Sequence, residues 1–220
     1  MAGLANGSCL VRYGDTCVLV NATMSKDARD GIDFLPLSVD YEERLYAVGK
    51  IPGGFVKREG KPTDKAILVS RVIDRPMRPL FPKDYRNDVT LNNLVLSVDP
   101  DCSPELTAML GSAIATAISD IPFDGPTSTT QVGLIDGEFV FNPNAAQRAV
   151  SDLQLTVAST RDKVIMIEAG ANEVPEAKMI EAIFAAHEVN QEVIKFIDEI
   201  VAECGKEKHA YTSCAVPEEL

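Results

Sequence analysis

The sequence lacks paired cysteines, long apolar runs and any secretion pattern at its start. Five cysteines are scattered along the 220 residues: Cys9, Cys17, Cys102, Cys204 and Cys214. No two of them form a C-x-x-C pair, which argues against a zinc site and is typical of reduced thiols. The longest apolar runs are shorter than a membrane span, so no membrane partner is expected. Without a signal peptide, we expect a cytoplasmic protein.

Positive charge is also scarce, because 21 lysines and arginines face 33 aspartates and glutamates, giving a net charge of −12. Residues 50–86 nevertheless hold ten of the 21 basic residues and four of the 33 acidic ones. This segment, the basic island, carries a net charge of +6 in a remainder of −18. Most surfaces intersperse the two signs, so the basic island is expected to face an anion. The acidic remainder argues against a protein that coats nucleic acid with its whole surface.

The first third of the chain predicts strands. Residues 9–13 and 16–23 read as two strands joined by a tight turn. Because the first element begins so early, the first strands of the fold are expected to be missing. Residues 34–39 are apolar on both faces, which predicts a buried strand with a charged exit at 40–44.

A loop and a helix follow within the basic island. Glycine and proline at 52–54 and 60–62 frame a flexible, exposed loop whose tip, residues 55–58, carries an aromatic, a valine and two cations. Thr63 is a suitable N-cap, and helical periodicity continues through Arg75. The apolar face of this helix contains Ala66, Val69 and Ile73. The opposite face contains Arg71, Arg75 and Arg78. Since Pro76 disfavours helical backbone at Arg75, Arg78 is expected at or beyond the helix end.

The second half predicts an alternation of strands and two helices. A strand is expected over 89–98, and a buried apolar helix begins at Ser103 and Pro104. Later strands are expected at 131–135, 139–141, 153–158 and 164–168, the first two joined by a type I′ turn at Asp136 and Gly137. A long helix runs from near Pro175 to Gly205. Its predicted core stripe contains Ile180, Ile183, Ile194, Ile197 and Val201. Residues 209–220 are polar and unpatterned and are expected to form a linker.

From the residues alone, the basic island has two interpretations. A loop bearing an aromatic and cations beside an arginine-lined helix suits single-stranded nucleic acid, since guanidinium groups hold phosphates and the ring stacks on a base. The alternative is a solvated basic face, or a surface that forms salt bridges with acidic parts of neighbouring subunits. Charge alone does not separate the two.

Other candidate sites carry weaker signals. His187 falls on the apolar stripe of the last helix and is interpreted as a core-edge residue, while His209 has no evident partner. The acidic cluster at 40–43 is interpreted as solvated, so no metal site is expected in this chain. Residues 110–115, LGSAIA, are only loosely similar to a kinase phosphate loop, because they lie mid-helix without a glycine-rich run.

Five segments of the sequence resemble the first RNase PH-like core domain of the bacterial polynucleotide phosphorylases. They are FLPLSVDYEERLYAVGKIPGGF, KREGKP, SRVIDRPMRPLFP, SVDPDCSPELTAMLGSAIATAISDIPFDGP and IEAGANEVPE. The resemblance covers nearly the whole chain. It implies a mixed α/β fold, an RNase PH-like core of the ribosomal protein S5 domain 2 type, over residues 1–205. Residues 206–220 would then begin the linker to a following helical domain.

The same resemblance implies a function. This family removes nucleotides from the 3′ end of RNA with inorganic phosphate as co-substrate, so the full-length protein is expected to be a phosphate-dependent polyribonucleotide nucleotidyltransferase. A homotrimeric ring, Mg²⁺ bound outside this chain and partners in RNA degradation are implied as well. Because the family builds its catalytic pocket mainly from a second core domain, no catalytic residue is expected in this chain. Little or no activity is expected of it alone.

Matched residue by residue, the resemblance assigns single-stranded RNA contacts to Phe55, Lys57, Arg58, Arg71 and Arg75. The first three belong to a channel loop, and the two helical arginines hold the RNA 3′ end. The family's usual loop has two aromatics and two arginines, whereas this chain has Val56 and Lys57, which reduces stacking area and bidentate phosphate contact.

Two alternatives stay open. One is a small-molecule kinase-like relative, for which the sequence lacks a glycine-rich loop. The other is a non-catalytic structural subunit of a ring, whose basic island pairs with acidic neighbours.

Overall fold

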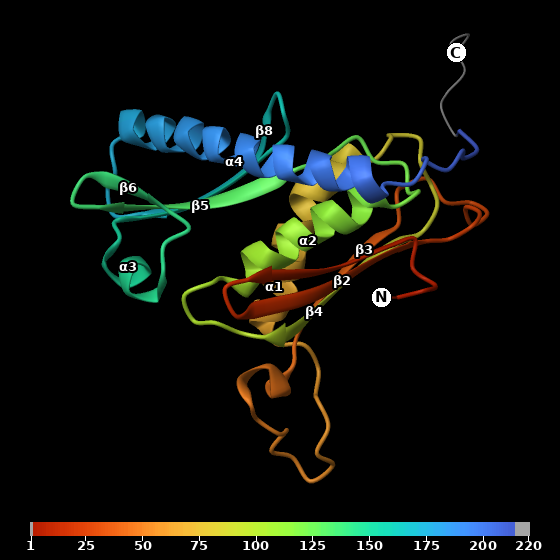
Figure 1. Cartoon of the computed structure of the whole chain (residues 1–220), viewed down its shortest axis with the longest axis horizontal. Helices are drawn as coiled ribbons and strands as arrows, with labels where there is room; N and C mark the ends of the chain where they lie inside the picture. The colour runs from red at the N-terminus through yellow and green to blue at the C-terminus, as the bar shows by residue number, and fades with distance from the viewer. Residues whose placement is uncertain (1, 214–220) are drawn as a thin grey trace.

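The computed structural model describes residues 2–213, and Figure 1 shows two sheets with helices packed against them. Met1 and residues 214–220, which include Cys214 and the end of the predicted linker, lie outside the described residues. The first sheet contains β1 (Gly7–Tyr13), β2 (Thr16–Met24), β3 (Leu37–Glu43) and β4 (Val89–Ser97). The second contains β5 (Ser128–Ile135), β6 (Glu138–Phe141), β7 (Leu153–Ser159) and β8 (Val164–Ala171). The helices are α1 (Asp64–Met77), α2 (Pro104–Ile118), α3 (Ala145–Val150) and α4 (Glu176–Cys204), with 3₁₀ turns η1 (Leu45–Val48) and η2 (Arg78–Leu80). The predicted mixed α/β class is confirmed.

The first sheet has the strand order β1-β2-β4-β3. β2 is antiparallel to β1 and β4, whereas β3 runs parallel to β4. A parallel pair requires a long crossover connection, and residues 44–88 supply it. This crossover contains α1 and the whole basic island. The chain therefore leaves the sheet at the end of β3 and returns to it through α1, and the basic residues lie along this connection.

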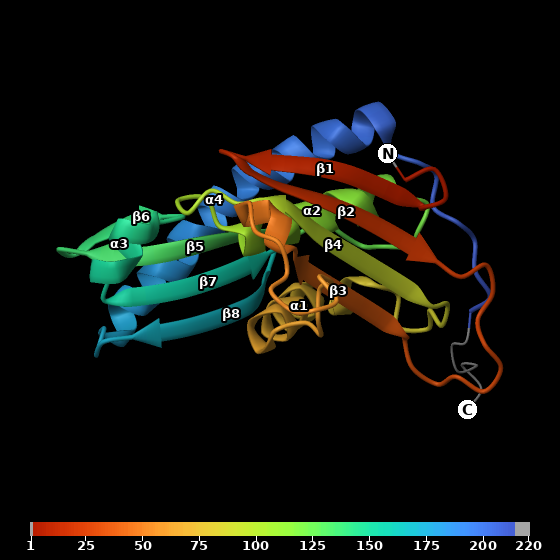
Figure 2. The ribbon, with the colours of Figure 1, turned by 90° about the horizontal axis from the view of Figure 1, so that it is seen from below.

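The second sheet has the order β6-β5-β7-β8 and is antiparallel throughout. Asp136 and Gly137 have positive φ angles of 50° and 83°, as the predicted type I′ turn requires. Helix α4 packs on β5 and β7 and also contacts α2. Figure 2 shows α4 crossing behind the second sheet and emerging beyond β1 at the edge of the first, so it links the two halves of the molecule.

Helix α2 is the centre of the core, as its apolar sequence predicts. Eleven of its fifteen residues are buried, and it packs against β1, β2 and α4. Ser103 caps it by accepting a hydrogen bond from the backbone N–H of Leu106 at 3.3 Å. Gly111, in the middle of α2, lies against Val20 of β2. The LGSAIA segment is therefore a packing surface, because its glycine meets a buried strand.

Two elements differ from the sequence predictions. The strand expected at 34–39 begins at Leu37 and continues through Glu43, and Phe34 is 59% exposed. Successive side chains of a strand point to opposite faces, and α1 covers one face of β3, so only Leu37 and Tyr41 on that face are buried. Helix α3 was not predicted, although Asn144 and Gln147 form a capping box at its start.

The predicted core stripe of α4 is wrong at its N-terminal end, because Ile180 is 54% exposed. The stripe that the sheet covers contains Ala182, Ala186, Asn190, Ile194 and Ile197. Small alanines let the helix approach the sheet closely. The buried Asn190 side chain bonds Thr130 Oγ1 at 2.9 Å, the Val157 carbonyl at 3.1 Å and Ser159 Oγ at 2.9 Å. A buried asparagine is tolerated among the aliphatic residues of this stripe because its side-chain amide has hydrogen-bond partners for both its oxygen and its nitrogen.

The segment after α4 lies on the body of the protein as far as residue 213. Lys208 Nζ donates to the carbonyls of Thr116, Ala117 and Ser119 at 2.7–3.1 Å, at the C-terminal end of α2. Its ammonium group satisfies carbonyls that have no partner within the helix. The domain boundary at residue 205 stays a prediction. In the described part of the chain, no helix has the length and apolar character needed to cross a bilayer.

The close approach of α2 to β2 makes a prediction about Gly111. A glycine inside a helix costs about 1 kcal/mol relative to alanine, so helix propensity alone favours Gly111→Ala. A Cβ at this position would lie 2.5 Å from Val20 Cγ2, and Val20 is fully buried. We therefore expect Gly111→Ala to lower the free energy of unfolding by about 1–3 kcal/mol in urea denaturation. Gly53→Ala, which meets open space, is the control. A stabilising effect of Gly111→Ala would contradict this packing.

Candidate nucleic-acid interface

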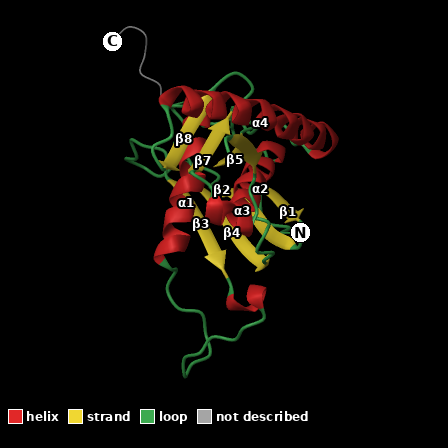
Figure 3. Cartoon of the chain, turned by 90° about the vertical axis from the view of Figure 1, so that its left-hand side faces the viewer, coloured by secondary structure: helices red, strands yellow, loops and turns green. Residues whose placement is uncertain are grey.

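Residues 44–63, the projecting loop, connect β3 to α1. Figures 1 and 3 show that this segment extends away from both sheets as a single protrusion. It contains the 3₁₀ turn η1, which ends at Gly49 in the left-handed conformation with φ 68°. At its far end Thr63 caps α1, as predicted, by accepting a hydrogen bond from the Ala66 backbone N–H at 3.1 Å. Each end of the loop is therefore joined to a regular element.

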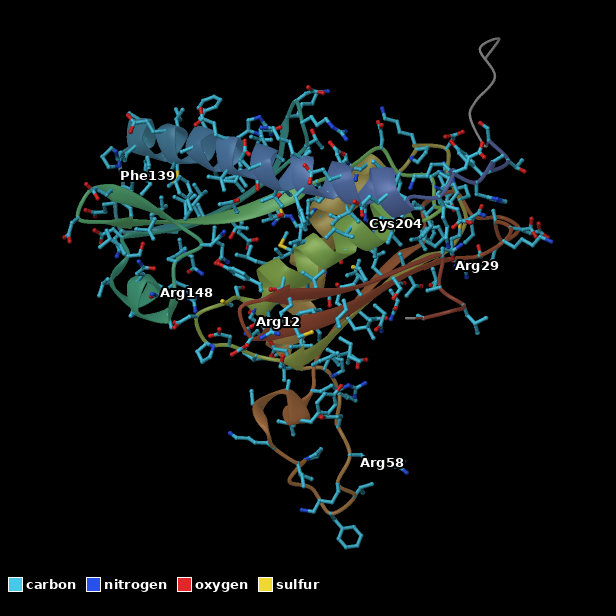
Figure 4. The ribbon with its side chains drawn as sticks, in the orientation of Figure 1. Arg12, Arg29, Arg58, Phe139, Arg148 and Cys204 are labelled. Carbon is cyan, nitrogen blue, oxygen red and sulfur yellow. The ribbon has the colours of Figure 1, made fainter. Side chains whose placement is uncertain are left out.

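The tip of the projecting loop is a defined turn. The backbone N–H of Lys57 donates to the Gly54 carbonyl at 3.0 Å, and Lys57 has a positive φ of 52°. The two residues between them are exposed, Phe55 by 102% and Val56 by 68%. Arg58 extends from the loop into open space in Figure 4. The turn thus presents an aromatic ring and two cations together, as the glycine and proline pattern predicted.

The arginine face of α1 forms the second part of the interface. Arg71 and Arg75 are exposed, opposite the buried Ala66, Val69 and Ile73, as helical spacing predicted. Arg71 lies seven positions after Asp64, the first residue of α1, which is about 10 Å along the helix axis. Glu168 of β8 lies 3.5 Å from Arg75, in an ion pair whose side chains are both about half exposed. Such exposed pairs contribute about 0–1 kcal/mol, so Arg75 remains available to an anion.

Arg78 has a different role from its two neighbours on the helix. The α-helix continues through Pro76 to Met77, and Arg78 follows its end, as expected. Its guanidinium bonds both carboxylate oxygens of Asp74, at 2.6 and 3.0 Å. It also donates to the carbonyls of Leu35 and Leu37 at 3.2 Å each. Arg78 therefore fixes the start of β3.

Sequence reasoning missed the apolar part of this surface. Ile67 is 49% exposed and Leu68 is 62% exposed, beside Arg71 on the outward side of α1. A groove of about 370 Å³ is lined by Leu37, Val39, Ser70, Arg71, Asp74, Arg75 and Arg78. Ile67 and Leu68 could have been identified from the sequence, because two aliphatic residues interrupt the polar face of α1 on which the arginines lie.

A larger cavity of about 840 Å³ lies between the two sheets at the N-terminal end of α2. Lys65 Nζ lies there 2.8 Å from Glu105 Oε1 and 3.3 Å from Glu43 Oε1. Ser103 Oγ donates to Glu105 Oε2 at 2.6 Å. A helix N-terminus favours an anion, and in this cavity the chain's own Glu105 carboxylate takes that position. Sequence reasoning did not identify this cluster, because its members come from three separate elements.

The charges of this cluster stabilise each other. Burial on its own raises the pKa of Glu105, but hydrogen bonds from Lys65 and Ser103 outweigh burial and leave that pKa below its ordinary value of 4.5. Burial likewise lowers the pKa of Lys65, yet hydrogen bonding to Glu105 and the charges of Glu105 and Glu43 leave it raised. Both shifts favour the ionised pair.

The other candidate residues are dispersed. His187 is half-buried on α4, with its ring 3.3–3.4 Å from Gln191 Nε2. Of the cysteines in the part of the chain that the structure describes, Cys9, Cys17, Cys102 and Cys204 form no disulfide. Within residues 2–213, no group of three or more His, Cys, Asp or Glu side chains is arranged to hold a metal ion. Within that range, the chemistry that the geometry supports best is the binding of an extended anion by the projecting loop and the arginine face.

Family models match most of the chain. The model described as "3' exoribonuclease family, domain 1" matches residues 1–122, and "3' exoribonuclease family, domain 2" matches residues 125–189. The junction falls between α2 and β5, so the two models correspond to the two sheets. The chain belongs to the 3′ exoribonuclease (RNase PH) family.

Individual curated proteins are similar to the chain over its whole length. The chain is 79% identical, over all 220 residues, to the polyribonucleotide nucleotidyltransferase of Lachnoclostridium phytofermentans, and 60% identical over 220 residues to that of Alkaliphilus oremlandii. It spans 32% and 31% of the length of these curated relatives and matches their N-terminal region. The crystal structure of rice (Oryza sativa) Rrp46 has the same fold, with a TM-score of 0.70, 16% identity and coverage of 89% of this chain and 88% of that chain.

The Glu105 cluster makes a prediction about pH. Because the pKa of Glu105 is lowered on folding, its stabilising contribution is present above the unfolded pKa and is lost as pH falls through the folded pKa. Glu105→Gln should reduce the free energy of unfolding by about 1 kcal/mol at pH 7 and by much less near pH 3. Urea denaturation at both pH values measures this difference. Glu188→Gln, at an exposed position of α4, is the control. Equal losses at both pH values would refute the assigned role of the carboxylate.

Proposed function

We propose that this chain is the RNA-gripping portion of a 3′-to-5′ phosphorolytic exoribonuclease. The proposed RNA contacts are Phe55, Lys57, Arg58, Arg71 and Arg75. The observation that carries the proposal is the projecting loop, whose tip exposes a whole aromatic ring beside two cations in a chain of net charge −12. A fully exposed phenyl ring gains nothing from the fold, so its placement is explained by a ligand that covers it.

The tip residues divide the recognition of RNA between them. Phe55 offers a face on which a base stacks, a contact that is worth about 1–3 kcal/mol and accepts any base. Arg58 offers a planar guanidinium to a phosphate, and Lys57 offers a compact charge with less directional bonding. This combination favours single-stranded RNA without strong sequence preference. It suits an enzyme that moves along a strand.

The arginine face of α1 extends the proposed contact toward the body of the protein. Arg71 and Arg75 lie beyond the base of the projecting loop and are exposed on α1, where Arg75 also pairs with Glu168 of β8. In the proposal they hold the backbone near the RNA 3′ end. Exposed Ile67 and Leu68 between the loop and these arginines provide an apolar surface for ribose or base.

The chemistry of phosphorolysis is assigned to a part of the protein outside this chain. The relatives named polyribonucleotide nucleotidyltransferase are about three times as long as this chain. We assign the Mg²⁺ ligands to that additional length, since within residues 2–213 no group of three or more His, Cys, Asp or Glu side chains is arranged to hold a metal ion. The phosphate pocket is assigned to the same additional length, as the family resemblance implies. The proposed assembly is a cytoplasmic homotrimeric ring, in which three projecting loops line one channel. Little activity is expected from the 220 residues alone.

The first test removes the aromatic and one cation from the tip. Phe55→Ala with Arg58→Ala should weaken the binding of a fluorescently labelled single-stranded RNA at least about tenfold, because a stacking contact and a phosphate contact are lost. The slope of log affinity against log salt should fall by about 0.7 for the lost phosphate contact. Fluorescence anisotropy at several salt concentrations measures both effects.

A matched pair of substitutions controls for composition. Phe184→Ala with Lys163→Ala also removes an exposed aromatic and an exposed cation, from α4 and the β7–β8 turn. This variant should bind RNA like the unaltered chain. If the tip variant stays folded and keeps its RNA affinity, the basic island is a structural surface and the proposal fails.

The second test concerns the arginine face. Arg71→Ala with Arg75→Ala should reduce RNA affinity and lower the salt slope by about 1.4, since two cations leave the path of the strand. The Tm should change by less than about 3 °C, because only the exposed Arg75–Glu168 pair is lost. Arg12→Ala with Arg29→Ala removes the same charge elsewhere, at two positions labelled in Figure 4, and is the control. A large fall in Tm with unchanged RNA affinity would assign these arginines to stability instead.

A further inference from the structure

One acidic residue interrupts the cations of the projecting loop. Glu59 is the single Asp or Glu within residues 44–63, and it follows Arg58 directly. A carboxylate at this position repels the phosphates that the neighbouring cations attract. Its presence in an RNA-binding loop therefore requires a compensating role.

The burial of Glu59 indicates that role. Every residue from 53 to 65 is exposed except Glu59, which is half-buried. Its side chain turns back toward the base of the loop, where Oε1 accepts a hydrogen bond of 2.9 Å from the backbone N–H of Leu45. Leu45 is the first residue of η1, and the preceding Arg44 makes no side-chain cap. Glu59 thus caps a turn that lies 14 residues away in the sequence.

This hydrogen bond joins the two limbs of the projecting loop. The backbone hydrogen bonds of the loop stay within one limb or within the tip. They run from Ala47 to Arg44, Gly49 to Tyr46, Lys50 to Leu45 and Lys57 to Gly54. In the described chain, the bond between Glu59 and Leu45 is the one hydrogen bond that connects residues 44–52 with residues 56–63. Without it, the outgoing and returning limbs are tied only where they meet β3 and α1.

We propose that Glu59 is a positioning residue that closes the projecting loop and thereby fixes the reach and direction of its RNA-binding tip. The inference rests on the proposed function, because positioning matters for the strand that the tip contacts. A closed loop loses less conformational freedom when it binds, so more of the contact energy appears as affinity. The repulsion between the carboxylate and RNA is offset in this way.

Two substitutions separate positioning from simple charge. Glu59→Gln keeps an amide oxygen that accepts the Leu45 hydrogen bond and removes the negative charge. Glu59→Ala removes both. If Glu59 acts only as a charge near RNA, the two variants strengthen RNA binding equally. If it closes the loop, Glu59→Gln binds single-stranded RNA as tightly as the unaltered chain or more tightly, whereas Glu59→Ala binds about 3- to 10-fold more weakly than Glu59→Gln.

A second measurement examines the free protein. Hydrogen exchange of the 220-residue chain without RNA should show the Leu45 amide exchanging at least about tenfold faster in Glu59→Ala, together with the hydrogen-bonded amides of Ala47, Gly49, Lys50 and Lys57. In Glu59→Gln these amides should exchange as in the unaltered chain. Glu188→Ala and Glu188→Gln, which remove the same charge from the exposed side of α4, should change neither exchange in the loop nor RNA affinity.

The outcomes distinguish this inference from the proposed function. Equal exchange and equal RNA affinity in Glu59→Ala and Glu59→Gln overturn the positioning role. Faster exchange in Glu59→Ala with rescue by Glu59→Gln supports the closure of the loop. If that rescue occurs while RNA affinity is unchanged by Glu59→Ala and by the double substitution of Phe55 and Arg58, the closure stands and the RNA-binding function fails.

Discussion

The burial of α2 is the constraint on which the rest of the structure depends. A helix with almost no polar face must be covered on several sides, and here β1, β2 and α4 cover it. Gly111 permits the close contact with β2, and the N-terminal end of α2 meets α1 through the ion pair between Glu105 and Lys65. Because α1 is fixed against this helix, the projecting loop that precedes α1 leaves the body at a defined place. The position of the interface is therefore a consequence of core packing.

The distribution of charge complements this geometry. The acidic remainder repels a polyanion over most of the surface, so RNA is directed to the basic island without a need for sequence-specific contacts. Within the island, not every cation is available to a ligand. Arg78 is engaged in an ion pair with Asp74 and in hydrogen bonds to two backbone carbonyls. Lys65 forms ion pairs with Glu105 and Glu43. The island's cations on the projecting loop, together with Arg71 and Arg75 on the outward side of α1, remain exposed.

Much of this arrangement could be predicted from the sequence, because local signals agree with the fold. Thr63 and Ser103 marked helix starts, glycines and prolines marked the loop, and the spacing of Arg71 and Arg75 placed them on one face. The errors came from tertiary context. The exposure of Ile180 depends on where the sheet ends beneath α4, and the inward turn of Glu59 depends on a backbone amide across the loop. No periodicity in the sequence encodes either relation.

The buried Asn190 has a mechanical consequence. Its amide is bonded to β5 through Thr130 and to β7 through Val157 and Ser159, so sliding α4 by one helical turn would strand several polar groups without partners. Hydrophobic stripes alone tolerate such a shift, because one aliphatic residue replaces another. The asparagine removes that freedom and gives the helix a single axial register. The second sheet and α4 must then move as one rigid unit, and a force applied to the outer side of α4 is transmitted to the sheet beneath it.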